Sequence, residues 1–168
     1  MSDEALARAC ECLRINGVWQ AQVSALINET LEAAPAFPED LEVLFKHVIS
    51  KSLWGEAEND DQHHYMLRVF IELGLRFVPA ENSGNNSEQE SAKEPDTYAQ
   101  IEATYVAEYI SDEDLDKDAI KAFATRNASF HVWPFWREFI TSQCSRMNLP
   151  RINLPLHNFG KQERPENP

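Results

Sequence analysis

Apolar and polar residues alternate in four stretches of the chain, residues 18–27, 41–51, 65–78 and 98–110. Alternation with a period of two is typical of strands that bury one face. The third stretch is the clearest, because every second residue from 65 to 77 is apolar. In the first stretch, we expect one face to hold Trp19, Ala21, Val23 and Ala25 and the other to hold Gln20, Gln22 and Ser24.

Three further stretches show the helical period of three to four residues. Residues 3–13 and 113–126 predict short helices, and residues 134–147 predict a long one. Four consecutive strands followed by helices indicate an α+β fold. We therefore expect a four-stranded antiparallel sheet followed by a short helix and a long C-terminal helix, in a single domain over residues 1–159.

The long helix is expected to begin at Pro134, because the first turn of a helix does not need the N–H that proline lacks. Its apolar stripe consists of two i, i+4 rows, Phe135, Phe139, Gln143 and Met147 in one and Trp136, Ile140 and Cys144 in the other. Pro150 disfavours helical geometry at the residue before it, so the helix should end near Met147.

Prolines and polar residues mark the connecting segments. Phe37 stands between Pro35 and Pro38, which favours an extended connection after the first strand. Residues 79–96 are rich in Ser, Asn and Glu and predict a flexible loop. Residues 150–156 have prolines at both ends and predict an extended piece on the surface, and residues 160–168 predict a disordered tail.

Charge and composition narrow the classes of function. The formal net charge is -13, which repels phosphate backbones, so we expect no nucleic-acid partner. No apolar run approaches the ~20 residues of a membrane span, so no membrane insertion is expected. The first ten residues carry acids and lack the apolar region of a signal peptide. With three cysteines, an odd number, the chain is expected to be cytoplasmic and without a disulfide framework.

Catalytic and metal-binding patterns are absent from the sequence. It contains no Gly-rich phosphate loop, no nucleophile elbow and no helical His pair. Cys10 and Cys12 have no matching second Cys/His pair, so they are weak evidence for zinc. His47 interrupts the apolar face of the second strand, and a single histidine there is more often structural than a ligand. We expect no catalytic residue, no metal and no cofactor, and hence no enzyme.

A family resemblance is carried by the stretch that follows Phe130. Pro-Phe-Trp-Arg-Glu, Ile-Thr-Ser, Ser-Arg, a proline, Asn-Leu and Asn-Phe stand in the order and spacing of the C-terminal part of SecB, the bacterial export chaperone. The segments FPEDLEV and YMLRVFIELGL resemble the family's second and third strands more loosely. The resemblance covers residues 13–159, and it is strong only from Phe130 onward.

The resemblance implies a homotetrameric, ATP-independent holdase, assembled as a dimer of dimers with the long helices at the interface. SecB binds unfolded preproteins and passes them to the SecA ATPase, and a branch of SecB-like proteins guards an antitoxin instead. SecB also docks SecA through acidic residues of its first strand and continues into a second C-terminal helix. Residues 13–28 contain no Asp or Glu, and the tail GKQERPENP has no apolar period, so SecA binding stays open.

Binding of unfolded polypeptide requires apolar side chains in an accessible groove, because the ligand has no fixed shape. The candidate client-binding residues are Phe37, Leu41, Val43, Phe45, Trp133 and Trp136. Small hydroxyl residues on one side of the long helix would let a partner approach closely. The candidate oligomer-interface residues are Phe139, Thr141, Ser142 and Ser145. A plain core role for each aromatic, and an oligomeric adaptor or antitoxin-guarding role for the protein, are the alternatives.

Overall fold

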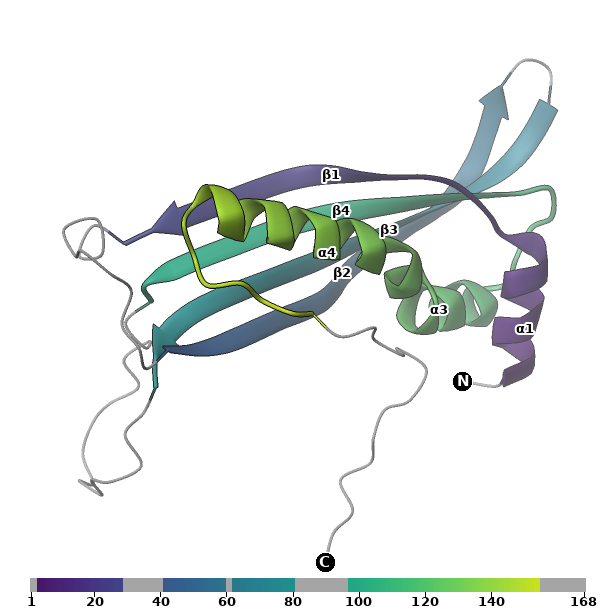
Figure 1. The fold of residues 1–168 in the computed structure, drawn as a ribbon. Coiled ribbons are helices and arrows are strands. Elements are labelled where there is room, and N and C mark those ends of the chain that lie inside the picture. Colours follow the sequence, from purple (N-terminus) through teal and green to yellow (C-terminus); the bar gives the residue numbers. More distant parts are fainter. Residues whose placement is uncertain (1–2, 29–40, 60–61, 81–96, 155–168) are drawn as a thin grey trace, which may run out of the picture.

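The computed structural model describes residues 3–28, 41–59, 62–80 and 97–154. A four-stranded antiparallel sheet with the strand order β1-β4-β3-β2 forms its centre (Figure 1). In chain order the elements are α1 (Asp3–Cys12), β1 (Arg14–Ile27), β2 (Leu41–Asn59), β3 (Gln62–Pro79), β4 (Ala99–Ser111), α3 (Lys117–Arg126) and α4 (Ala128–Arg146). The predicted α+β fold, with a four-stranded antiparallel sheet followed by a short and a long helix, is confirmed.

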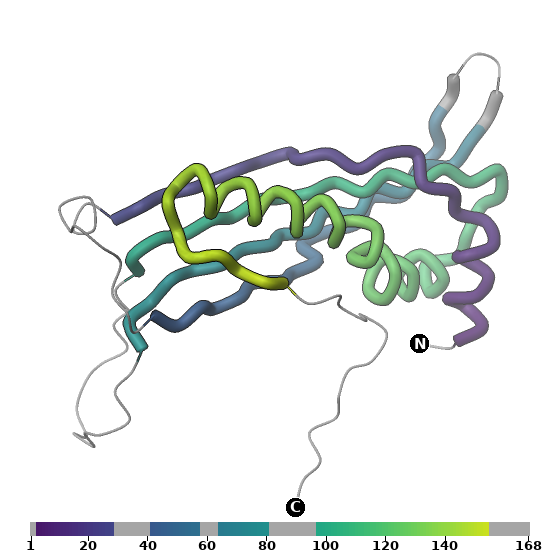
Figure 2. The backbone as a smooth tube through the Cα atoms, viewed as in Figure 1, coloured from purple at the N-terminus to yellow at the C-terminus, as the bar shows by residue number. Residues whose placement is uncertain are grey.

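The helices lie on one face of the sheet, and the tube in Figure 2 follows α4 along that face. α4 packs over β4, β3 and β1, whereas α1 packs against α3 at one end of the sheet. The core therefore lies between α4 and the two central strands. It contains Leu67, Val69, Ile71, Leu73, Leu75 and Phe77 of β3 and Ala99, Ile101, Ala103, Tyr105, Ala107 and Tyr109 of β4, all nearly or fully buried.

Two irregularities in β1 change which face its side chains occupy. The register with β4 shifts between Ile15 and Gly17 and again between Gln20 and Gln22. A bulge inserts one extra residue, so side chains before and after it no longer follow one alternation. Trp19 pairs with Val106 on the outer face of the sheet, whereas Val23 and Ala25 pair with residues of the core face. The prediction that Trp19 shares a face with Val23 and Ala25 was wrong for this reason.

The second and third strands are longer than their sequence pattern indicated. β2 and β3 pair from Leu41 with Pro79 to Asn59 with Gln62, whereas β3 pairs with β4 only from Tyr65 onward. The end of the β2–β3 hairpin therefore projects beyond the four-stranded sheet (Figure 1). The acidic segment over residues 55–59 belongs to β2, because cross-strand pairing overrides the weak strand propensity of Gly and Glu.

α4 begins six residues earlier than predicted, at Ala128, so Pro134 lies inside the helix. The buried residues Ala128, Ser129 and Val132 extend the apolar stripe toward the N-terminus. Proline removes the hydrogen bond to the carbonyl of Phe130, and both residues lie on the exposed side of α4. Water can replace the missing donor there, which explains why the helix continues through Pro134.

A Schellman motif ends α4 and reverses the chain. The N–H of Leu149 donates to the carbonyl of Cys144 at 2.8 Å, and the N–H of Asn148 donates to the carbonyl of Ser145 at 3.4 Å. Asn148 has a φ of 53°, in the left-handed region. After the turn, Leu149 and Leu154 are both buried and belong to the core. Leu154 anchors the segment after α4 to the core, whereas Pro150, Arg151 and Asn153 are exposed, as predicted for a surface segment.

Substitution of Asn148 tests this motif. Asn148→Val is expected to lower the free energy of unfolding by ~1–2 kcal/mol, because a β-branched side chain is strained in the left-handed region. Asn148→Gly should leave the stability unchanged or raise it slightly, since glycine adopts this conformation without strain. Urea unfolding of the two variants checks the prediction, and equal stability of both would contradict the motif.

Candidate polypeptide-binding site

The apolar row on the core face of β2 forms the candidate site. Val43 pairs with Phe77 and Phe45 pairs with Leu75, so both side chains point to the side of the sheet that holds α4. β2 is an edge strand, and α4 covers the other three strands. Phe45 is therefore 60% exposed, although its cross-strand neighbour Leu75 is buried. Leu41 and Val43 are half-buried beside it.

His47 connects this row to the start of α4. Its Nε2 lies 2.8 Å from the Oγ of Ser129, which is buried in the first turn of the helix. Phe130 follows Ser129 in the chain and is 61% exposed. The contact brings two exposed phenylalanines, Phe45 and Phe130, to the same side of the sheet. We call Leu41, Val43 and Phe45 the β2 strip.

The six predicted client-binding residues divide into three groups. Leu41, Val43 and Phe45 lie along the β2 strip, where apolar surface is accessible. Trp133 and Trp136 are 8% and 1% exposed and belong to the core of the chain. Phe37 lies outside the described residues. The client-binding role stays a prediction for all six, but the burial of the two tryptophans leaves little of their surface for a bound polypeptide.

Trp136 is the central side chain under α4. Its ring lies edge-on to Tyr105 of β4, with 6.4 Å between the ring centroids, and 5.9 Å from the ring of Phe139. Burial raises the pKa of Tyr105 to about 12, so its hydroxyl stays protonated and accepts a hydrogen bond from Gln20 at 2.9 Å. These contacts fix α4 on the sheet and thereby set the position of Phe130 relative to the β2 strip.

The predicted oligomer-interface residues lie on two sides of α4. Thr141 and Ser145 are exposed and Ser142 is half-buried, on the side that faces away from the sheet. Phe139 is buried against Trp136 and contributes to the core instead. Phe130 and Phe135 are both exposed aromatics of α4, although Phe135 was predicted to belong to the apolar stripe. The early helix start places Phe130 on the helix, which the prediction for residues 134–147 did not include.

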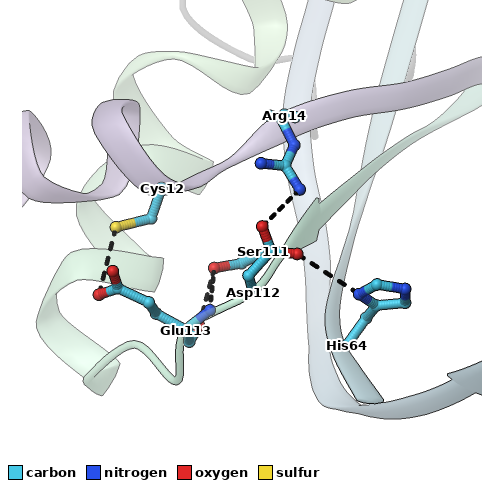
Figure 3. Close-up of polar contacts among 6 residues, drawn as sticks. All are labelled: Cys12, Arg14, His64, Ser111, Asp112 and Glu113. Carbon is cyan, nitrogen blue, oxygen red and sulfur yellow. Dashed lines mark hydrogen bonds and ion pairs between the residues drawn. The ribbon is translucent and has the colours of Figure 1, made fainter. Parts of the chain in front are cut away.

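A cluster of polar side chains fixes the turn after β4 (Figure 3). Arg14 of β1 donates to Asp112 at 2.8 Å, and His64 of β3 approaches the same carboxylate at 3.4 Å. The hydrogen bond from Arg14 is the main cause that lowers the pKa of Asp112. Arg8 and Cys12 of α1 both approach Glu113. The cluster ties α1, β1 and β3 to one turn, which is a structural role.

Over residues 3–28, 41–59, 62–80 and 97–154, no group of three or more His, Cys, Asp or Glu side chains has an arrangement that would hold a metal ion. None of the helices in these ranges is both long and apolar enough to cross a membrane.

Comparisons with known proteins place the fold. No family model matches the chain, and no curated protein sequence matches it. Among solved structures, the chain is similar to the SecB-like chaperone Rv1957 of Mycobacterium tuberculosis, in complex with a ChAD peptide from the HigA1 antitoxin. The sequence identity is 14%, the TM-score is 0.57, and the match covers 91% of this chain and 96% of the other. The chain therefore has a SecB-like α+β fold.

Proposed function

We propose that this protein is a molecular chaperone that binds non-native polypeptide segments on the β2 strip, without ATP. The observation that carries the proposal is the apolar row of β2 that the described helices leave accessible, where Phe45 is 60% exposed beside a fully formed core. The SecB-like fold supports it, because the similar structure is a chaperone that holds a peptide. The cytoplasm is the proposed location.

The chemistry of the β2 strip suits a ligand without fixed shape. Partial burial of an exposed aromatic ring contributes about 1–2 kcal/mol, so affinity would come from several such contacts along an extended segment. The free edge of β2 can add main-chain hydrogen bonds to that segment. The net charge of -13 would favour segments that carry Lys or Arg.

Two physiological roles fit this binding mode. The first is that of a holdase that keeps preproteins unfolded for export and transfers them to SecA. The second is protection of an antitoxin, and the antitoxin peptide in the similar structure favours it. The absence of Asp and Glu from residues 13–28 also favours the second role, because it removes the acidic docking residues that SecB has on its first strand.

A binding measurement with one protein in two states tests the proposal. A reduced, permanently unfolded protein carrying a fluorophore should bind the chaperone without nucleotide, with an increase in fluorescence anisotropy. The same protein in its native, oxidised state should not bind. Equal binding of the two states, or binding of neither, would contradict a role in capturing non-native polypeptides. To separate the two roles, an antitoxin segment and a preprotein segment can then be compared under the same conditions.

Assembly is the next prediction. We expect a homotetramer, a dimer of dimers, in which the outer side of α4 packs against another copy. Thr141→Arg should then dissociate the assembly, because the long, charged arginine side chain cannot be accommodated between two closely packed helices. Thr125→Arg is a matched control, since Thr125 of α3 is also exposed and also donates to a carbonyl four residues earlier. Light scattering at micromolar concentration checks this, and a monomeric wild-type protein would contradict it.

A further inference from the structure

The outer face of the sheet, opposite α4, carries a second apolar surface that the proposed function does not use. Trp19, Val106, Phe70 and Lys51 form one continuous cross-strand row through β1, β4, β3 and β2. Gly17, Glu108, Arg68 and Leu53 form the adjacent row. Trp19 is 42% exposed and Leu53 is 50% exposed. We call these two rows the Trp19 surface.

Backbone bulges on both edge strands place side chains on this surface. In β1, the register shift between Gln20 and Gln22 puts Trp19 on the outer face. In β2, the shift between Ile49 and Lys51 does the same for Lys51 and Leu53, which would otherwise follow Val43 and Phe45 onto the core face. Bulges redirect side chains and are frequent beside binding sites. Two independent bulges thus act on the same cross-strand row from opposite edges of the sheet.

The charges of the Trp19 surface differ from those of the rest of the chain. Lys51 Nζ lies 4.1 Å from the centroid of the Phe70 ring, and the guanidinium carbon of Arg68 lies 5.9 Å from the Trp19 ring. The carboxylate of the surface, Glu108, is buried and accepts hydrogen bonds from Asn16 at 2.7 Å and from Arg68 at 2.6 Å. Within the described residues, Lys51 has no ion pair with a carboxylate. Two cations thus flank two accessible rings in a protein of net charge -13.

We propose that the Trp19 surface is a docking site for an acidic, apolar peptide segment of a partner protein. Apolar side chains of the segment would cover Trp19, Phe70 and Leu53, and its carboxylates would pair with Lys51 and the outer N–H groups of Arg68. These ion pairs form at distances shorter than the Debye length of about 8–10 Å. Salt screens the more distant negative charges of the chain, so they do not decide binding here. Single-stranded nucleic acid also binds surfaces of aromatic and cationic side chains. Each of its nucleotides carries a negative phosphate, however, and the net negative charge of the chain repels these phosphates.

This site is independent of the β2 strip, because Phe45 and Trp19 lie on opposite faces of the sheet. A partner docked on the outer face would leave the proposed polypeptide-binding site accessible. The protein would then carry two different peptides at once, a non-native segment on one face and an acidic segment on the other.

Three probes and five proteins test the proposal. The probes are a fluorescent 12-residue peptide of alternating Leu and Glu with one central Trp, the same peptide with Lys for Glu, and a 12-nucleotide single-stranded DNA. The proteins are wild type, Lys51→Glu, Trp19→Ala, Phe45→Ala and Lys121→Glu, the last replacing an exposed lysine of α3 as a charge control. Circular dichroism melting confirms that each variant folds.

We expect the acidic peptide to bind wild type and the Lys121→Glu variant equally. Lys51→Glu should weaken its binding at least tenfold, and Trp19→Ala about fivefold or more. Phe45→Ala should leave this binding unchanged, which distinguishes the site from the β2 strip. Failure of the acidic peptide to bind, equal binding of the Lys peptide, preference for DNA, or equal losses in Lys51→Glu and Lys121→Glu would each overturn the proposal.

Discussion

Replacing Trp136 by alanine is expected to lower the free energy of unfolding by ~3–5 kcal/mol. The side chain is 1% exposed and contacts Tyr105 on the sheet and Phe139 on its own helix. Its loss would leave a cavity between α4 and β4 that the surrounding rings cannot fill, and interiors tolerate such voids poorly. A loss of this size is a large part of the stability of a domain, which is ~5–15 kcal/mol.

Urea unfolding at one fixed protein concentration measures this effect, because assembly makes stability concentration-dependent. The midpoint should fall while the slope of the transition stays unchanged. Phe135→Ala is the matched control, since Phe135 precedes Trp136 in α4 but is 49% exposed. Equal losses in the two variants would show that α4 does not hold to the sheet through Trp136.

Replacing Phe45 by alanine is expected to weaken binding of many unrelated unfolded polypeptides by about five- to thirty-fold, which corresponds to ~1–2 kcal/mol. The side chain is 60% exposed, so its removal should change stability little. Added salt should alter the loss only slightly, because salt screens charges rather than apolar contacts. Fluorescence anisotropy titrations with several labelled clients measure this loss of affinity.

Leu26→Ala provides the control for this variant. Leu26 is 64% exposed on β1, and it pairs with Gln100 on the outer face of the sheet. Leu26→Ala therefore removes a similar amount of accessible apolar surface at a place away from the β2 strip. If Leu26→Ala weakens client binding as much as Phe45→Ala, binding is not localised on β2. If Phe45→Ala unfolds the chain, Phe45 is a core residue.

The sequence predicted the elements because alternation and helical period report directly on burial. Every second residue from 65 to 77 is apolar, and in β3 those from Leu67 to Phe77 are all buried. The faces of β1 and β2 could not be predicted in the same way. One inserted residue reverses all later side chains, and neither Ala21 nor Ser50 differs in type from an ordinary strand residue.

The start of α4 and the candidate site show a second limit of prediction from the sequence. A proline at the first helical position is the commonest arrangement, so local rules placed the start of α4 at Pro134. Tertiary burial of Ala128 and Val132 prevailed over that rule. Similarly, the sequence alone does not distinguish an aromatic residue of the core from one on a binding surface. Trp136 and Phe45 differ in their place in the fold, since Trp136 packs between α4 and β4 and Phe45 lies on the edge strand β2.

Aggregation of an unfolded client in the absence of nucleotide tests the central proposal most directly. A denatured protein diluted into buffer scatters light as it aggregates, and the chaperone should suppress this at near-stoichiometric concentration. Phe45→Ala should suppress it less than wild type, and Leu26→Ala should match wild type. We predict that order of activity. Aggregation that proceeds equally with wild type, with both variants and with an inert protein of the same concentration would contradict the chaperone function.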